Sequence, residues 1–258
     1  MTDEFVGVVH GVMARIAPGA RVIDISHGVP RHDILAGALT LERALPYMPA
    51  GVHLAVVDPE VGARRRAIAI RTADEGRLLV GPDNGLLLAA AERLGGCVAA
   101  VDVSRSPWRL EPLSATFHGR DVFGPVAAHL AKGADLESAG DPIEIDELVR
   151  LERPHAVVAD DGSVLAHALS FDTFGNVTLD LAHADLARTS LRLGRQVEIE
   201  VGGRVHTGHY AHTFSDVPLG ALVVYEDPVR ALAIAVSSGD AAQALGVRSG
   251  DEIRLRAA

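Results

Sequence analysis

The chain has 258 residues, of which 48% are hydrophobic, and a formal net charge of -10. This length predicts one large domain or two modest ones. The negative charge and a single lysine exclude nucleic acid as a partner, because phosphate binding needs clustered basic residues. A single cysteine excludes an intrachain disulfide and a thiolate metal cluster.

Two further absences bear on localisation. No apolar run reaches the roughly 18 residues that span a bilayer, so we expect no membrane association. The first residues carry Asp3 and Glu4 where a basic leader would be expected. We therefore predict a soluble, cytoplasmic protein.

The first 150 residues alternate short apolar strands with helix-like segments. This pattern is typical of an α/β fold, with a mostly parallel sheet covered by flanking helices. In chain order we expect a helix at 5–16, a strand at 21–25, a helix at 34–45, strands at 53–57, 67–71 and 78–80, a helix at 85–94, a strand at 98–102 and a helix at 122–131. Each helix has apolar residues three and four positions apart, so each can lay one face on the sheet.

The pattern changes near residues 141–153. Beyond it, short apolar runs separated by Gly, Asp and His turns predict strands at 163–170, 196–201, 221–225, 231–236 and 252–255. We therefore predict two domains, an α/β domain over residues 1–150 and an all-β domain, a small barrel or sandwich, over residues 151–258.

The stretch DPEVGARRR follows an apolar strand and places Asp58 near Arg65. Ligands of open α/β sheets bind in the loops beyond the strand ends. A carboxylate beside a guanidinium stays ionised and oriented, which suits the positioning of water or a hydroxyl. A tight turn with a solvated ion pair would use the same residues, and such surface pairs are common.

Two more loops sit where a helix is expected to begin. In GPDNG, Asp83 or Asn84 can cap the helix, and the same geometry presents oxygens to a ligand. In TFHGRD, His118 precedes a glycine at a helix entrance, where its near-neutral pKa suits proton transfer. A lone histidine at such a position also has a purely structural interpretation.

In the second domain, SFDTFGN combines an acid, an aromatic and an amide around a glycine. Asp172 can hold an ammonium group, Phe174 can face a base, and Asn176 has the donor and acceptor that adenine recognition needs. A ligand-free turn would also use Gly and Asn in this way. His206, His209 and His212 do not project to one face of a strand, so we expect no metal site.

DPEVGARRR, GPDNG, TFHGRD, SFDTFGN and HTFSDVP occur in this order along the chain. Together they resemble the S-adenosyl-L-methionine (SAM) hydroxide adenosyltransferases, which are related to the bacterial fluorinase and chlorinase. The resemblance runs from about residue 2 to residue 254. It implies SAM hydrolysis to adenosine and L-methionine without a cofactor, by an N-terminal α/β domain and a C-terminal β-barrel. It also implies a homotrimer with active sites between neighbouring subunits.

Carried over to this chain, the resemblance places the catalytic Asp, Arg and His on Asp58, Arg65 and His118. It puts Phe117 near the ribose. It assigns Asn176 and Phe214 to the adenine, and Asp3 and Asp172 to the methionine ammonium group.

Two features depart from the family pattern. The first residue aligns just past the family's opening strand, so we expect the first domain to lack it. Glu226 and Asp227 stand where a small Ser-rich turn would bind the methionine carboxylate. The alternative functions are a non-catalytic SAM- or adenosine-binding protein and a halide-dependent 5′-halo-adenosine synthase.

Overall fold

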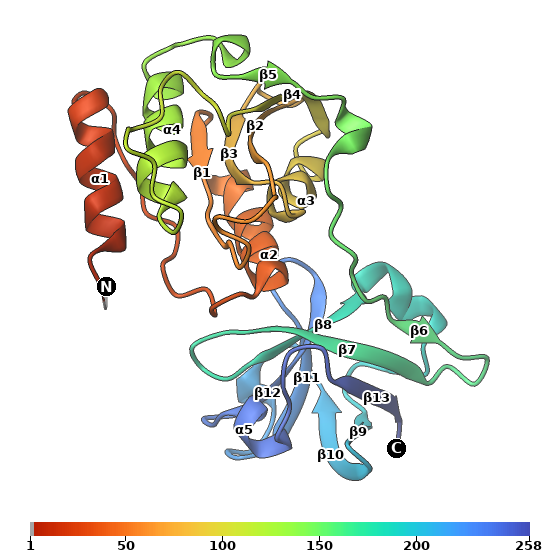
Figure 1. The fold of residues 1–258 in the computed structure, drawn as a ribbon. Helices are drawn as coiled ribbons and strands as arrows, with labels where there is room; N and C mark the ends of the chain where they lie inside the picture. Colours follow the sequence, from red (N-terminus) through yellow and green to blue (C-terminus); the bar gives the residue numbers. More distant parts are fainter. Residues whose placement is uncertain (1–2) are drawn as a thin grey trace. The chain divides into compact units, whose positions relative to one another are not determined.

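The computed structural model describes residues 3–258, and the chain forms two compact units that divide between Glu152 and Arg153 (Figure 1). Each unit has its own sheet and its own hydrophobic core. None of the helices in this described part combines the length and apolar character that a membrane crossing requires.

The N-terminal unit is a sheet with helices on its faces. Its helices are α1 (Phe5–Ile16), α2 (Ile34–Ala44), α3 (Leu86–Glu92) and α4 (Gly124–Ala131), with short helical turns η1 (Leu45–Tyr47), η2 (Gly119–Phe123), η3 (Leu136–Ser138) and η4 (Ile145–Glu147). Its strands are β1 (Val52–Leu54), β2 (Ala67–Thr72), β3 (Leu78–Pro82), β4 (Cys97–Asp102) and β5 (Asp141–Pro142), in the order β1-β3-β2-β4-β5.

Strand β2 shows how the layers form. Successive side chains of a strand point to opposite faces of the sheet. Ile68 and Ile70 enter the core shared with α2 and α3, whereas Ala67 and Ala69 enter the core shared with α4. Helix α1 buries none of its residues and packs against α4 and η2 (Figure 1).

Two expectations for this unit are wrong. The sheet is mixed rather than mostly parallel, since β1 pairs with β3 in parallel but β2–β3, β2–β4 and β4–β5 are antiparallel. Residues 73–77, which join β2 to β3, are too few for a parallel crossover. Residues 21–25 form no strand, because nothing among residues 3–258 pairs with them; Val22, Ile23 and Ile25 are exposed instead.

The C-terminal unit is a closed β-barrel. Its strands are β6 (Val157–Val158), β7 (Val164–Phe171), β8 (Val177–Ala182), β9 (Gln196–Val201), β10 (Arg204–Tyr210), β11 (Leu222–Glu226), β12 (Ala231–Val236) and β13 (Glu252–Ala257), with α5 (Ala241–Leu245) and the turns η5 (His183–Arg188) and η6 (Phe214–Asp216). The pairing of β13 with both β9 and β7 closes the ring, and β6 adds to β7 outside it. The predicted α/β fold with a C-terminal barrel is confirmed.

The barrel core follows from alternation along its strands. In β7, Val164, Ala166 and Ala168 are buried and the residues between them are more exposed. Val197 and Ile199 of β9 reach the same core. Closure pairs β13 with both β9 and β7, so the ring has no open edge, and the alternation places the apolar side chains inside it.

Two loops of the N-terminal unit meet at Gly62. This residue lies in the β1–β2 connection and has a φ of 79°. A Cβ there would lie 2.2 Å from the carbonyl oxygen of Ala115, in the loop before η2. Only glycine allows both the left-handed backbone and this close approach.

Replacing Gly62 with Ala should therefore destabilise the protein through backbone strain and a collision with Ala115. Gly76→Ala is the matched control, because Gly76 has a φ of 59° but no atom within 4 Å of a built Cβ. We expect Gly76→Ala to cost roughly 1–2 kcal/mol of unfolding free energy and Gly62→Ala to cost about 1–3 kcal/mol more. Urea unfolding of both variants measures the difference, and equal midpoints would contradict this account of the two loops.

Candidate active site

The first component of the site is an ion pair in the β1–β2 connection. Asp58 lies in the loop that follows β1, and Arg65 lies two residues before β2. Arg65 Nε donates to both carboxylate oxygens of Asp58, at 2.9 and 3.0 Å, and Nη2 donates to Oδ2. Each side chain is only 4% exposed. The solvated surface pair that the sequence left open is therefore excluded in favour of a buried, multidentate one.

The second component is His118, which immediately precedes the π-helical turn η2. Arg65 Nη2 lies 2.9 Å from His118 Nδ1. A guanidinium can only donate, so we assign Nδ1 as the acceptor and place the imidazole proton on Nε2. Burial and the neighbouring Arg65 lower the pKa of His118, against the opposing effect of Asp58 and Asp121. His118 is therefore held neutral.

Asp121 stabilises the turn η2, which begins immediately after His118. Its carboxylate accepts the backbone N–H of Ser114 at 2.8 Å and pairs with Arg120 at 2.5 Å, and its side chain is 1% exposed. Turns of this π-helical type are frequent at functional sites. The ring of Phe123, at the end of η2, lies under Arg65, with 5.2 Å from Cζ to the ring centroid. Sequence reasoning assigned no role to Asp121 or Phe123.

The GPDNG loop bonds to the residues next to the ion pair, Val57 and Arg66. Asn84 donates to the carbonyl of Val57 at 2.8 Å, and its own oxygen accepts the N–H of Leu86 at the start of α3. Asp83 accepts from Arg66 at 2.8 Å and from the N–H of Val149 at 2.9 Å. Both residues are buried, so they position the loop that carries Asp58 and Arg65.

A hollow of ≈ 540 Å³ opens beside this loop. It is lined by Ile34, Glu60, Ala63, Arg64, Arg65, Arg66, Asp83, Asn84 and Val149. Its volume falls within the range of small-molecule sites, roughly 300–1,000 Å³.

Two of the predicted binding residues lie at the start of α1 and before η2. Phe117 packs edge-to-face on Phe5, with ring centroids 4.8 Å apart, and Arg120 lies over its ring at 5.1 Å. Asp3 is exposed and accepts the N–H of Phe5 at 3.3 Å. Phe117 is adjacent to His118 in the chain. Phe5 contacts both Phe117, through its ring, and Asp3, through its backbone N–H.

The predicted binding residues of the barrel unit gather mainly in the β7–β8 turn. Asp172 Oδ1 accepts the backbone N–H groups of Phe174 and Asn176, both at 2.9 Å, and Oδ2 accepts the Asn176 amide at 2.7 Å. Phe174 is 75% exposed. Phe214 lies in a different loop, where its ring contacts Tyr225 at 4.8 Å.

Glu226 and Asp227, which stand where the family pattern has a Ser-rich turn, both have hydrogen-bonding partners within the barrel unit. Asp227 Oδ1 accepts the N–H groups of Val229 and Ala231, at 3.0 and 2.9 Å. Glu226 pairs with His183 at 2.7 Å and accepts from Tyr210 at 3.3 Å. Burial and the adjacent Glu226 raise the pKa of Tyr210 to about 12.

One group of possible metal ligands was not expected from the sequence. Within residues 3–258, the ligand atoms of His10, Asp24 and His27 all lie within 4.8 Å of one another, and this is the one such group of three or more. His206, His209 and His212 do not belong to any such group in that part of the chain. The sequence spacing of these residues does not indicate a metal site, because His10 lies on α1 whereas Asp24 and His27 lie on the segment that follows it.

The comparisons with known proteins agree on one family. Residues 1–140 match the SAM hydroxide adenosyltransferase N-terminal domain, and residues 166–254 match the C-terminal domain. A solved structure from Thermotoga maritima, described as an uncharacterized conserved protein, superposes with a TM-score of 0.89 at 35% identity, covering 99% of this chain and 96% of the other.

Named relatives extend the match. An (R)-S-adenosyl-L-methionine hydrolase from Salinispora tropica is 49% identical over 100% of this chain and 94% of its own length. The hydrolase of that name from Thermus thermophilus is 39% identical, with 99% and 95% covered. A fluorinase from Nocardia brasiliensis is 25% identical, with 99% and 93% covered. The chain belongs to the SAM hydroxide adenosyltransferase family.

Proposed function

We propose that this chain hydrolyses S-adenosyl-L-methionine to adenosine and L-methionine, by attack of an activated water on C5′. Relatives at up to 49% identity over the whole chain are named for this activity. The observation that carries the mechanism is the contact of Asp58 and His118 with the same guanidinium, that of Arg65.

The reaction needs a better nucleophile more than a better leaving group. The new bond joins the water oxygen to C5′, while the C5′–S bond breaks and its electron pair returns to sulfur as neutral methionine. The sulfonium leaves readily, so no acid is needed on that side. The residues therefore have to orient the water, remove its proton and stabilise hydroxide character.

The geometry suggests how the three side chains share this work. Asp58 holds the guanidinium of Arg65 ionised and aimed. The Nδ1 lone pair of His118 accepts from Arg65 in the resting arrangement, which leaves the imidazole proton on Nε2. We propose that Arg65 Nη2 turns from Nδ1 to the forming hydroxide, and that Nδ1 then takes the proton. A water needs no metal for this step, and we propose no cofactor.

The remaining predicted residues would bind the substrate. We propose Phe117 at the ribose, Asn176, Phe174 and Phe214 around the adenine, and Asp3 and Asp172 at the methionine ammonium group. Asp172 already organises its turn through three hydrogen bonds, so its carboxylate is oriented before a ligand arrives. We further propose a cytoplasmic homotrimer in which each site draws residues from two chains.

Purified protein incubated with SAM should convert it to adenosine and L-methionine, as followed by chromatography. Because the relatives are named for the (R) epimer, both sulfonium epimers should be supplied separately. Recovery of intact SAM would identify a non-catalytic binder. A halogenated nucleoside formed with added chloride or fluoride would identify a halide-dependent synthase.

Asp58→Asn, Arg65→Lys and His118→Gln should each lower kcat by on the order of 10²-fold or more, because each removes a part of the water-activating set. Arg77→Lys is the matched control for burial and charge. The Arg77 side chain is itself 5% exposed and is ion-paired with Glu75, but it donates to the carbonyls of Leu45 and Pro49 rather than to His118. Wild-type turnover in all three site variants, with folding confirmed by circular dichroism, would refute the mechanism.

The pH dependence should report the neutral form of His118. The ordinary pKa of histidine is about 6.5. Burial and Arg65 lower the pKa of His118, so His118 should take up a proton only at a lower pH than an ordinary histidine does. We expect kcat/KM to stay level as pH falls through neutrality and to drop at lower pH. In Asp58→Asn the drop should move to still lower pH, because Asp58 opposes the lowering. An acid limb unchanged by this substitution would assign the titration to another group.

Subunit mixing tests the shared site. Asp58→Asn alters the N-terminal unit and Asn176→Ala alters the barrel unit, and each variant alone should form inactive or weakly active trimers. Unfolding and refolding a mixture should restore activity, because some sites then combine an intact α/β unit with an intact barrel from a neighbour. Size-exclusion chromatography with light scattering gives the mass. An active monomer would contradict the trimer.

A further inference from the structure

Helix α1 packs against α4 and η2, but neither α1 nor the segment 20–28 that follows it is deeply buried. No residue of α1 is buried. In the segment, Val22, Ile23 and Ile25 are between 39% and 48% exposed, and residues 21–25 have no strand partner among residues 3–258. One polar contact that joins α1 to this segment is the pairing of His10 with Asp24.

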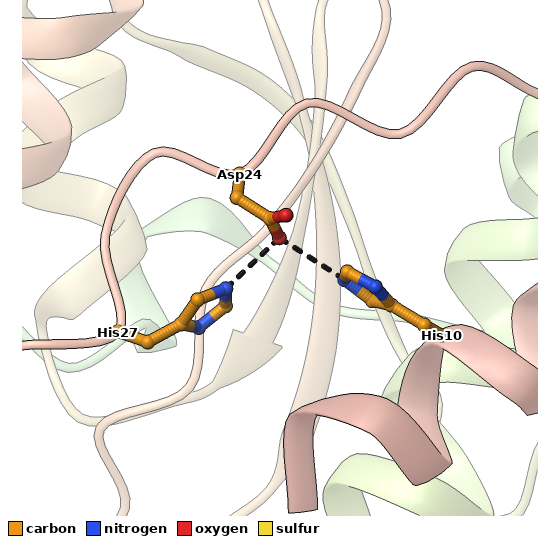
Figure 2. Close-up of side chains that lie close together, drawn as sticks. All are labelled: His10, Asp24 and His27. Atoms are coloured by element: carbon orange, nitrogen blue, oxygen red, sulfur yellow. Dashed lines mark hydrogen bonds and ion pairs between the residues drawn. The ribbon is translucent and has the colours of Figure 1, made fainter. Parts of the chain in front are cut away.

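Two histidines meet on one carboxylate oxygen. Figure 2 shows the Asp24 carboxylate between the ring of His10, which lies on α1, and the ring of His27, which lies farther along the same segment as Asp24. His10 Nε2 lies 3.0 Å and His27 Nε2 2.9 Å from Asp24 Oδ1. The backbone N–H of Gly28 donates to Ser26 Oγ at 3.1 Å, which shapes the loop next to His27.

The spacing of these three atoms fits a shared ion. All of them lie within 4.8 Å of one another. Two ligands bound about 2.1 Å from one ion are about 3 Å apart at right angles and about 3.4 Å apart at the tetrahedral angle that Zn²⁺ prefers. The rings are inclined at 68°, with centroids 6.3 Å apart, so the two imidazoles are not stacked and both direct their edges at Asp24.

The donor set selects the kind of ion. Two imidazoles and one carboxylate suit borderline divalent transition metals, whereas Mg²⁺ and Ca²⁺ prefer oxygen ligands alone. The three side chains are 34%, 51% and 40% exposed, in the order His10, Asp24 and His27, so water can complete the coordination shell.

We propose that His10, Asp24 and His27 bind one divalent transition-metal ion, with Zn²⁺ as the type case, and that this ion clips α1 to the segment 20–28. The site takes no part in the proposed reaction. Its consequence is structural, since α1 carries Phe5 near its start and Phe5 packs on Phe117. A metal that holds α1 would therefore also restrain the Phe117 side chain.

The test uses tag-free full-length protein freed of metal with a chelator. Titration with ZnCl₂ in a calorimeter should give saturable binding of one ion per chain. CoCl₂ should give visible absorption bands typical of nitrogen and oxygen coordination. Zn²⁺ should also raise the melting temperature, because an ion that binds only the folded state stabilises it.

Three variants separate ligation from hydrogen bonding. His10→Ala, His27→Ala and Asp24→Asn should each weaken Zn²⁺ binding by at least about tenfold. Asp24→Asn keeps a neutral acceptor for the imidazole N–H groups, so it preserves the hydrogen bonds while removing the anionic ligand. Circular dichroism confirms that each variant is folded.

His183→Ala is the matched control. His183 also pairs with a carboxylate, Glu226, at 2.7 Å and is 48% exposed, but it belongs to no three-ligand group among the described residues. This variant should bind Zn²⁺ as the wild type does. Absence of saturable binding, equal affinity in Asp24→Asn and wild type, or equal loss in His183→Ala would each overturn the proposal.

Discussion

The ion pair between Asp58 and Arg65 is the interaction on which the loop geometry of the N-terminal unit, and the reaction that we propose for it, depend. Removing two charges from water costs several kcal/mol for each, and the attraction between them offsets this only when the geometry is good and other hydrogen bonds are made. Here Arg65 bonds both carboxylate oxygens, reaches His118 and lies over Phe123. Loss of either charge leaves the other buried alone, which typically costs about 3–5 kcal/mol. The same contacts therefore stabilise the loop and aim its polar groups.

This arrangement sets the protonation of His118. A guanidinium that donates to Nδ1 requires a lone pair there, and burial further disfavours the charged imidazolium. A neutral imidazole next to a cation is suited to accept a proton only when that cation is drawn to a new negative charge. In the mechanism that we propose, proton uptake by Nδ1 is coupled to hydroxide formation, because Arg65 has to release Nδ1 before it can reach the hydroxide.

Most helices and strands could be predicted from the sequence, but the pairing of some strands could not. The apolar period of α2 and the alternation in β7 and β9 identify a helix and two strands, because local side-chain periodicity reflects which face is buried. The short link at residues 73–77 makes β2 and β3 antiparallel, which the apolar pattern of the two strands did not reveal. Residues 21–25 have a strand-like sequence but lack a partner, and pairing is not a local property.

The motifs that carry Asp58, Arg65 and His118 can be read from the chain, and their order identifies the family to which the chain belongs. Folding was needed to show that Arg65 bridges Asp58 and His118, that their loops meet at Gly62, and that the Asp172 carboxylate accepts hydrogen bonds from its own turn. His10 is likewise joined to Asp24 and His27 by folding alone. The physical reason is common to all of these: the order of residue types is written along the chain, whereas burial and donor–acceptor geometry arise between segments far apart in it.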